Sequence, residues 1–111
     1  MLPSEAISGH RHVPRATFGP DQIPLSTSFG RPTAYIAVHV FRRTPYEDYF
    51  RGVEQIMDDY GGRPHWGKLH FQTSDSLGGR YPQWYRFQAA RRRLDPTGRF
   101  ANDYLDRVLG S

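Results

Sequence analysis

The sequence predicts an α+β fold: a fragment of an antiparallel sheet, two to three packing helices and a disordered N-terminus. Two patterns support this prediction. Residues 33–42 place apolar side chains on both faces at a period of two, which is typical of a buried strand. Residues 44–60 and 82–94 instead space their apolar side chains three and four positions apart, as amphipathic helices do.

The strand predicted over Thr33–Arg42 has two apolar faces. One face carries Ala34, Ile36, Val38 and Val40, and the other carries Tyr35, Ala37, His39 and Phe41. Such a strand needs cover on both sides, so we expect it to be largely buried. A second strand, expected at Leu69–Gln72, would complete only a hairpin-sized sheet, which is marginally stable by itself. The pattern is therefore that of a piece of a larger sheet.

A first helix is predicted to begin at Thr44 and to end at Gly61. Thr44 suits the N-cap position and Pro45 the first helical position, and Glu47 would complete a capping box. Glycines directly after the last periodic residue favour a helix end there. The side chains that share one helical face, and that we expect in the core, are Tyr46, Tyr49, Phe50, Val53, Ile56, Met57 and Tyr60.

Shorter elements are predicted for the C-terminal half. Thr73–Gly79 is expected to form a loop or a short helical turn, and Pro82–Leu94 a second helix with Trp84 among its anchors. Asp95–Gly98 has the composition of a turn, and Asn102–Leu109 is expected to form a last short helix.

The chain is divided at about residue 20. Residues 1–20 contain Pro, Gly, Ser and His without apolar periodicity, so they are predicted to be disordered. Residues 21–111 are predicted to form one unit that begins with a turn-rich stretch. A domain of that size buries only about 60–65% of its unfolded surface, which again indicates part of a larger protein.

The sequence is basic and contains no cysteine. Its net charge of +4 and pI of about 9.8 favour an anionic partner. The cluster Arg91–Arg93 is interpreted either as a solvated helix face or as an anion-binding group. The lack of cysteine excludes disulfides, thiolate catalysis and cysteine-based metal sites. We expect a cytoplasmic or membrane-associated chain without a transmembrane segment, because no apolar run is long enough to cross a bilayer.

Neither a catalytic triad nor a metal site is predicted. His65 and His70 are five positions apart, which suits neither a helical metal pair nor two ligands on one strand face. His39, in the middle of the predicted strand, is interpreted as a structural histidine or as a site residue. Trp66 is interpreted either as a packing residue or as a stacking platform.

Lys68 is the single lysine of a chain that carries fourteen arginines. An arginine is always charged, whereas a lysine ammonium is a compact point charge whose pKa can shift. Lys68 lies in the string Arg63–His70, beside a tryptophan, a glycine and two histidines. Lysine scarcity fits either coding bias or a chemical role, so only the neighbouring residues can separate the two interpretations.

The string Pro64-His65-Trp66-Gly67-Lys68 resembles the His-Trp-x-Lys motif of the sugar-1,4-lactone oxidase family. These are FAD-linked enzymes of the vanillyl-alcohol-oxidase type, and the similarity is greatest to bacterial members. Residues 1–20 are not matched by the resemblance. Its further positions are Ile23–Ser26, Ala34–Val40, Tyr81, Pro82, Trp84, Phe87, Leu94–Phe100, Asn102 and Tyr104.

The resemblance implies that residues 21–111 form the C-terminal part of a substrate (cap) domain, with FAD as cofactor and a sugar lactone or polyol as substrate. Lys68 and His65 match the motif and are the implied catalytic residues. His65, Trp66 and Lys68 are implied to contact the flavin. A fixed cation there would stabilise the negative charge that develops during hydride removal, and the three donors of a lysine suit a polyol.

The FAD-binding domain of this family precedes the matched segment and is not found in this sequence. The resemblance therefore implies a missing FAD-binding domain or polypeptide as partner, and oxidase activity of the chain alone is not expected. The alternative interpretation is a small basic module that binds nucleic acid or another polyanion through Arg91–Arg93, Trp84 and Tyr85. Nucleic acid is not the partner that the resemblance favours, and no metal is expected.

Overall fold

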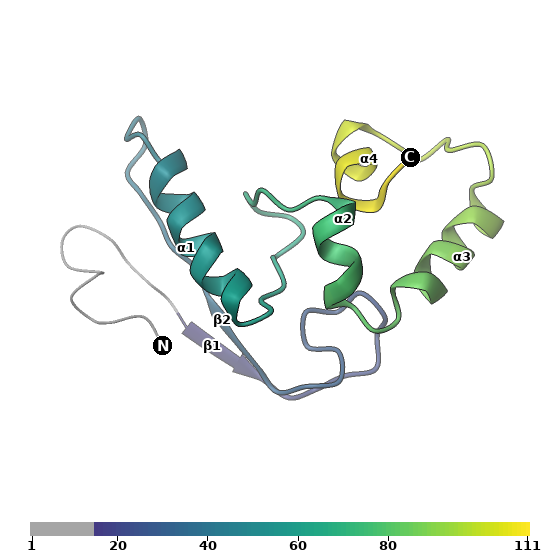
Figure 1. The fold of residues 1–111 in the computed structure, drawn as a ribbon, viewed down its shortest axis with the longest axis horizontal. Helices are drawn as coiled ribbons and strands as arrows, with labels where there is room; N and C mark the ends of the chain where they lie inside the picture. The colour runs from purple at the N-terminus through teal and green to yellow at the C-terminus, as the bar shows by residue number, and fades with distance from the viewer. Residues whose placement is uncertain (1–14) are drawn as a thin grey trace.

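The computed structural model describes residues 15–111, in which a two-stranded antiparallel sheet is followed by four α-helices and one 3₁₀ turn (Figure 1). The predicted α+β class is confirmed. The sheet and α1 lie on one side of the molecule, and α2, α3 and α4 gather on the other. The elements are β1 Arg15–Phe18, β2 Thr33–Ile36, α1 Glu47–Asp59, α2 Ser74–Leu77, η2 Gly78–Arg80, α3 Trp84–Leu94 and α4 Asp103–Leu109.

The sheet is shorter and begins earlier than the sequence predicts. β1 lies within the range 1–20 that was expected to be disordered, and residues 1–14 of that prediction lie outside the described residues. β2 ends at Ile36 rather than at Arg42, because its partner β1 begins at Arg15, directly opposite Ile36. No ladder among the described residues continues beyond that pair, so the following backbone is irregular.

Burial of both strand faces was also predicted wrongly. No residue between Thr33 and Arg42 is buried, and Phe41 exposes 65% of its surface. A strand is buried on both faces only when a layer covers each of them. In residues 15–111 the sheet has two strands and no second sheet packs on it.

Leu69–Gln72, predicted as a strand, is irregular. Its backbone donors bond to side chains instead of a neighbouring strand. The Phe71 N–H donates to the Glu54 carboxylate at 2.9 and 3.1 Å, and the Gln72 N–H donates to His70 Nδ1 at 3.2 Å. These bonds satisfy buried donors that a sheet would otherwise have to satisfy.

Helix α1 begins three residues later than the predicted cap and ends where predicted. Thr44 belongs to a turn, in which its N–H donates to Phe41 O at 3.0 Å and Arg43 has a positive φ of 69°. The predicted capping box is therefore wrong. At the other end Gly61 has a φ of 65°, and the Gly62 N–H donates to Met57 O at 2.8 Å, so the glycine stop is confirmed.

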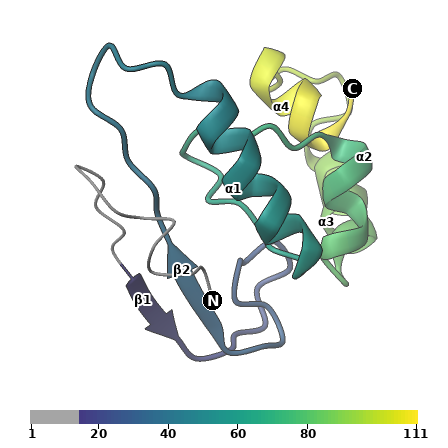
Figure 2. The same cartoon turned by 60° about the vertical axis from the view of Figure 1, so that its left-hand side comes forward.

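The apolar stripe of α1 does not enter the core of the described chain, contrary to the prediction. None of the residues of the helix is buried, and Ile56 exposes 41% of its surface. Figures 1 and 2 show α1 beside the segment that links it to β2. The helix has the correct pattern for a core helix but lacks a covering layer among residues 15–111.

The closed core lies instead between the C-terminal helices. α2 packs on α4, and the buried side chains are Leu77, Tyr81, Trp84, Val108 and Leu109. The short helical turn predicted at Thr73–Gly79 is present as α2 and the start of η2. The second helix begins at Trp84 rather than Pro82.

Local signals at the C-terminus are confirmed. Asn102 caps α4 by accepting the Leu105 N–H at 2.8 Å, and Gly110 ends the helix with a φ of 80°. The Asp95 carboxylate accepts the N–H groups of Arg99 and Phe100 at 2.8 and 2.9 Å, which closes the predicted turn.

We expect Leu77→Ala to lower the free energy of unfolding by about 2–5 kcal/mol, because it opens a cavity at a fully buried position. Leu94→Ala is the matched control: Leu94 is 72% exposed, so its truncation should cost less than about 0.5 kcal/mol. Urea denaturation followed by tryptophan fluorescence compares the two variants. Equal effects would contradict the placement of the core.

Candidate functional site

The three site residues predicted from the sequence lie together in one tight turn. The Lys68 N–H donates to the His65 carbonyl at 3.1 Å, and the Gly67 N–H donates to His65 Nδ1, also at 3.1 Å. A Cβ at Gly67 would lie 3.3 Å from His65 Cε1. The turn therefore places the His65 ring against the Gly67 backbone, and glycine leaves room for that contact.

Lys68 and His65 are exposed, and the side-chain ammonium of Lys68 makes no hydrogen bond or ion pair within residues 15–111. Both line a broad open groove of about 1060 Å³. One wall is the segment that follows β2, and the other is α1. The apolar side chains of these walls include Val38, Val40, Phe50, Val53 and Met57. An exposed cation thus lies at the edge of an apolar groove.

Trp66 is turned toward the core, in contrast to its neighbours. Its indole N–H donates to the Tyr81 hydroxyl at 3.1 Å, and the two ring centroids are 5.8 Å apart. Its carbonyl oxygen accepts a hydrogen bond from the Tyr104 hydroxyl. Trp66 therefore holds the turn at two points, by its side chain and by its backbone.

His70 is 7% exposed and links the string to α4. Its Nε2 lies 3.0 Å from the Tyr104 hydroxyl, and the Arg107 guanidinium donates to the His70 carbonyl at 3.0 Å. Burial lowers the pKa of His70, and the nearby positive charge of Arg107 lowers it further, while Glu54 acts in the opposite direction. His70 and His65 do not face one shared centre.

A polar cluster, which sequence reasoning missed, fastens α1 to Gln72 and Arg80. The Gln72 side-chain amide donates to both Glu54 and Asp58, and Arg80 pairs with Asp58 at 2.8 Å. Arg80 also donates to Gly62 O at 2.6 Å. Glu54 and Asp58 lie four positions apart on the α1 face that turns toward Gln72, and that spacing was the only signal in the sequence.

Arg63 fastens the loop before β2 to the same string. Its Nε donates to Arg80 O at 2.8 Å, and its Nη1 donates to Thr27 O and Phe29 O at 3.2 and 2.9 Å. Its guanidinium carbon lies 5.1 Å from the centre of the Tyr81 ring. Burial lowers the pKa of Arg63, and Arg31 adds to this effect, but an arginine so placed stays charged.

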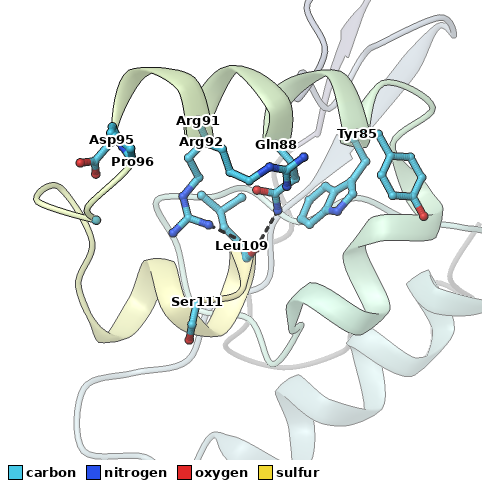
Figure 3. A pocket seen from close by; sticks show the side chains of 10 residues that line it. Tyr85, Gln88, Arg91, Arg92, Asp95, Pro96, Leu109 and Ser111 are labelled. Atoms are coloured by element: carbon cyan, nitrogen blue, oxygen red, sulfur yellow. Dashed lines mark hydrogen bonds between the residues drawn. The ribbon is translucent and has the colours of Figure 1, made fainter.

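Part of the basic run on α3 is engaged inside the chain. Figure 3 shows Gln88 and Arg91 directed at the end of α4, beside a pocket of about 410 Å³. Gln88 Nε2 donates to Leu109 O at 2.6 Å, and Arg91 donates to Gly110 O at 2.7 Å. Trp84 is buried and cannot stack on a base. The alternative of a polyanion-binding module is therefore not supported.

Two further features are absent from residues 15–111. No group of three or more His, Asp or Glu side chains there is placed to hold a metal ion. Within the same range, no helix has both the length and the apolar character required to cross a bilayer. His39 is exposed and lies on the wall of the groove.

We expect the stability of the chain to fall at acidic pH because of His70. Its pKa is lowered below 6.5 in the folded state, so the unfolded state binds more protons between that pKa and about 6.5. The stabilisation is complete above pH 6.5 and is lost as the pH falls through the folded pKa. Melting temperatures at pH 5 and 7.5 should differ less in His70→Gln than in the natural chain, and an unchanged difference would contradict the assignment.

Comparison with known proteins gives one consistent result. A family model described as D-arabinono-1,4-lactone oxidase matches residues 11–108. The match therefore includes β1 and the last part of the range 1–20, which the sequence resemblance had not covered. The His65–Lys68 turn and the groove lie within it, and so does the C-terminal helix core apart from Leu109.

The chain is similar to one segment of several longer oxidoreductases. It is 62% identical over 91 residues to an L-gulono-1,4-lactone dehydrogenase of Mycobacterium tuberculosis, covering 82% of this chain and 21% of that protein. It is 40% identical over 93 residues to the L-gulonolactone oxidase of Mus musculus, covering 80% and 21%. An alditol oxidase of a Streptomyces species is 36% identical over 96 residues, covering 84% and 23%.

The chain thus spans about a fifth of the length of these relatives. The matched family nevertheless covers most of the chain. The protein belongs to the D-arabinono-1,4-lactone oxidase family.

Proposed function

We propose that this chain supplies the lysine-bearing wall of the substrate site in an FAD-dependent oxidoreductase that oxidises a CH–OH group of a sugar-1,4-lactone or polyol. The observation that carries the proposal is the exposed Lys68 ammonium, held on a tight turn beside an apolar groove. The names of the relatives, which are lactone dehydrogenases, lactone oxidases and an alditol oxidase, support the substrate class.

The residues of the turn fit the reacting edge of a flavin. When bound, FAD would accept the hydride from the substrate carbon. Lys68 would stabilise negative charge that develops at that edge and on the substrate oxygen, because a fixed cation in a partly dry site acts strongly. Its three N–H donors also suit a substrate with several hydroxyl groups.

His65 is prepared to act as a donor beside Lys68. Its Nδ1 accepts the Gly67 N–H, so a neutral His65 ring carries its proton on Nε2. That N–H would orient a substrate hydroxyl. We assign Trp66 to the flavin contact through the part of its indole ring that is not buried. No residue of 15–111 is assigned to the adenosine diphosphate part of the cofactor.

We propose that this chemistry also needs an FAD-binding domain or polypeptide. We infer that residues 21–111 are the C-terminal part of a cap domain, and that the rest of the enzyme covers the α1 stripe and the groove. Two observations support this inference: the unburied apolar face of α1 and the fifth of the relatives' length that the chain spans. An apolar patch of this kind marks a contact surface.

We expect Lys68→Met to lower turnover by about 10²–10³-fold, which is the usual cost of removing one charge-stabilising donor. The test uses a chimera of the Mycobacterium tuberculosis L-gulono-1,4-lactone dehydrogenase in which this chain replaces its matching segment. Flavin absorbance should be unchanged, because the fold is kept. Arg93→Met, which removes an exposed cation of α3, is the control with normal turnover. Full activity of Lys68→Met would refute the role of Lys68.

We also expect the chain to bind the rest of the enzyme through the groove. When this chain is co-expressed with the remaining segment of the same relative, the two should co-purify. Val53→Asp places a charge on the groove wall and should abolish co-purification. Leu94→Asp, on exposed α3, should not. Equal behaviour of the two variants, or no association of the natural chain, would contradict the proposed partner.

A further inference from the structure

A chain of hydrogen bonds runs from the buried His70 to the exposed His65. The Gln72 N–H donates to His70 Nδ1 at 3.2 Å, and His70 Nε2 lies 3.0 Å from the Tyr104 hydroxyl. The Tyr104 hydroxyl donates to the Trp66 carbonyl oxygen. The next link is the peptide unit between Trp66 and Gly67, whose N–H donates to His65 Nδ1 at 3.1 Å.

The donor and the acceptor of each hydrogen bond in this series can be assigned in one consistent way. Because a backbone N–H can only donate, Nδ1 of His70 must be an acceptor, and a neutral His70 then carries its proton on Nε2. The Nε2–H donates to Tyr104, which leaves the tyrosine proton for the Trp66 carbonyl. Each donor polarises the next in such a chain.

The Trp66–Gly67 peptide connects these hydrogen bonds to the turn that carries His65 and Lys68. A peptide bond is planar, so fixing the direction of its carbonyl also fixes the direction of its N–H. Tyr104 holds the oxygen on the buried side, and the Gly67 N–H holds His65 Nδ1 on the exposed side. The His65 ring is therefore oriented by a residue of α4 that it does not contact.

The charges around His70 favour its neutral form. Arg107 of α4 donates to the His70 carbonyl and lies 5.3 Å from the centre of the Tyr104 ring. Glu54 of α1 is the opposing charge, and it is already engaged by the Phe71 N–H and the Gln72 amide. A protonated His70 would direct two donors, Nδ1–H and the Gln72 N–H, at each other.

We propose that His70 and Tyr104 are positioning residues that fix the orientation and tautomer of His65, and with it the Lys68 turn, through the Trp66–Gly67 peptide. This inference rests on the proposed function, because it assigns His65 and Lys68 to the reacting site. It goes beyond that function by naming two residues that act without touching the substrate or the flavin.

The kinetic test uses the flavin-loaded chimera described above. Tyr104→Phe should lower kcat about tenfold and change KM less than twofold, because the orientation of His65 matters most as charge develops. In a His65→Ala background the same substitution should lower kcat no further, since its effect runs through His65. Tyr85→Phe, which removes the hydroxyl of an 81% exposed tyrosine, is the matched control.

Additive effects of Tyr104→Phe and His65→Ala would overturn the proposal, as would normal turnover of either single variant. His70→Gln provides a second variant, because a glutamine amide can still donate to Tyr104. It should retain more activity than His70→Leu, and equal loss in both would also overturn the proposal. Melting temperatures show which variants are folded.

A structural measurement separates this proposal from the proposed function. Hydrogen exchange of the Gly67 amide should be several-fold faster in Tyr104→Phe than in Tyr85→Phe, whether or not the chimera turns over. If Lys68→Met is fully active while Gly67 responds as expected, the role of Lys68 fails and the hydrogen-bond chain stands. If Lys68→Met is inactive while Gly67 exchange is the same in both tyrosine variants, the positioning role fails alone.

Discussion

The burial of Tyr81 is the constraint on which the rest of the structure depends. Its ring is 2% exposed and is stacked on Trp84, with the centroids 6.2 Å apart. Its hydroxyl accepts the Trp66 indole N–H, and Arg63 lies over its ring. Burial raises the pKa of Tyr81, so it remains a neutral phenol at physiological pH. One side chain thus joins the helix core to the turn that carries Lys68.

The N-terminal and C-terminal halves of residues 15–111 differ in how far their apolar side chains are buried. The C-terminal helices bury their apolar residues among themselves, whereas α1 and β2 leave theirs at an open groove. Within residues 15–111, one part is closed by its own residues, and the other leaves its apolar side chains along an open groove. The Lys68 turn lies at the boundary, where a rigid support and an open site are both present.

Sequence reasoning succeeded mainly where the determining interactions are local, although the local capping box predicted at Thr44 was wrong. The short helix that follows Asn102, the Gly61 helix end and the Asp95 turn each depend on residues within five positions of one another. It failed for the length of β2 and the burial of α1, because both depend on what lies opposite in space.

The candidate site shows the same division. The motif from His65 to Lys68 was found because its residues are adjacent, and the structure brings them into one turn. The supports of that turn were missed. Tyr104 reaches Trp66 from 38 positions away along the chain, and Tyr81 reaches it from 15. Both tyrosines occupy positions of the family resemblance, but sequence alone gave no sign of which atoms they hold.

Arg63 has a mechanical consequence. Its guanidinium donates hydrogen bonds to the carbonyls of Thr27 and Phe29 in the loop before β2, and its backbone continues through Pro64 into His65. Proline restricts the backbone of this link. Tilting the sheet against the helices would therefore break these bonds or pull on the turn that carries Lys68.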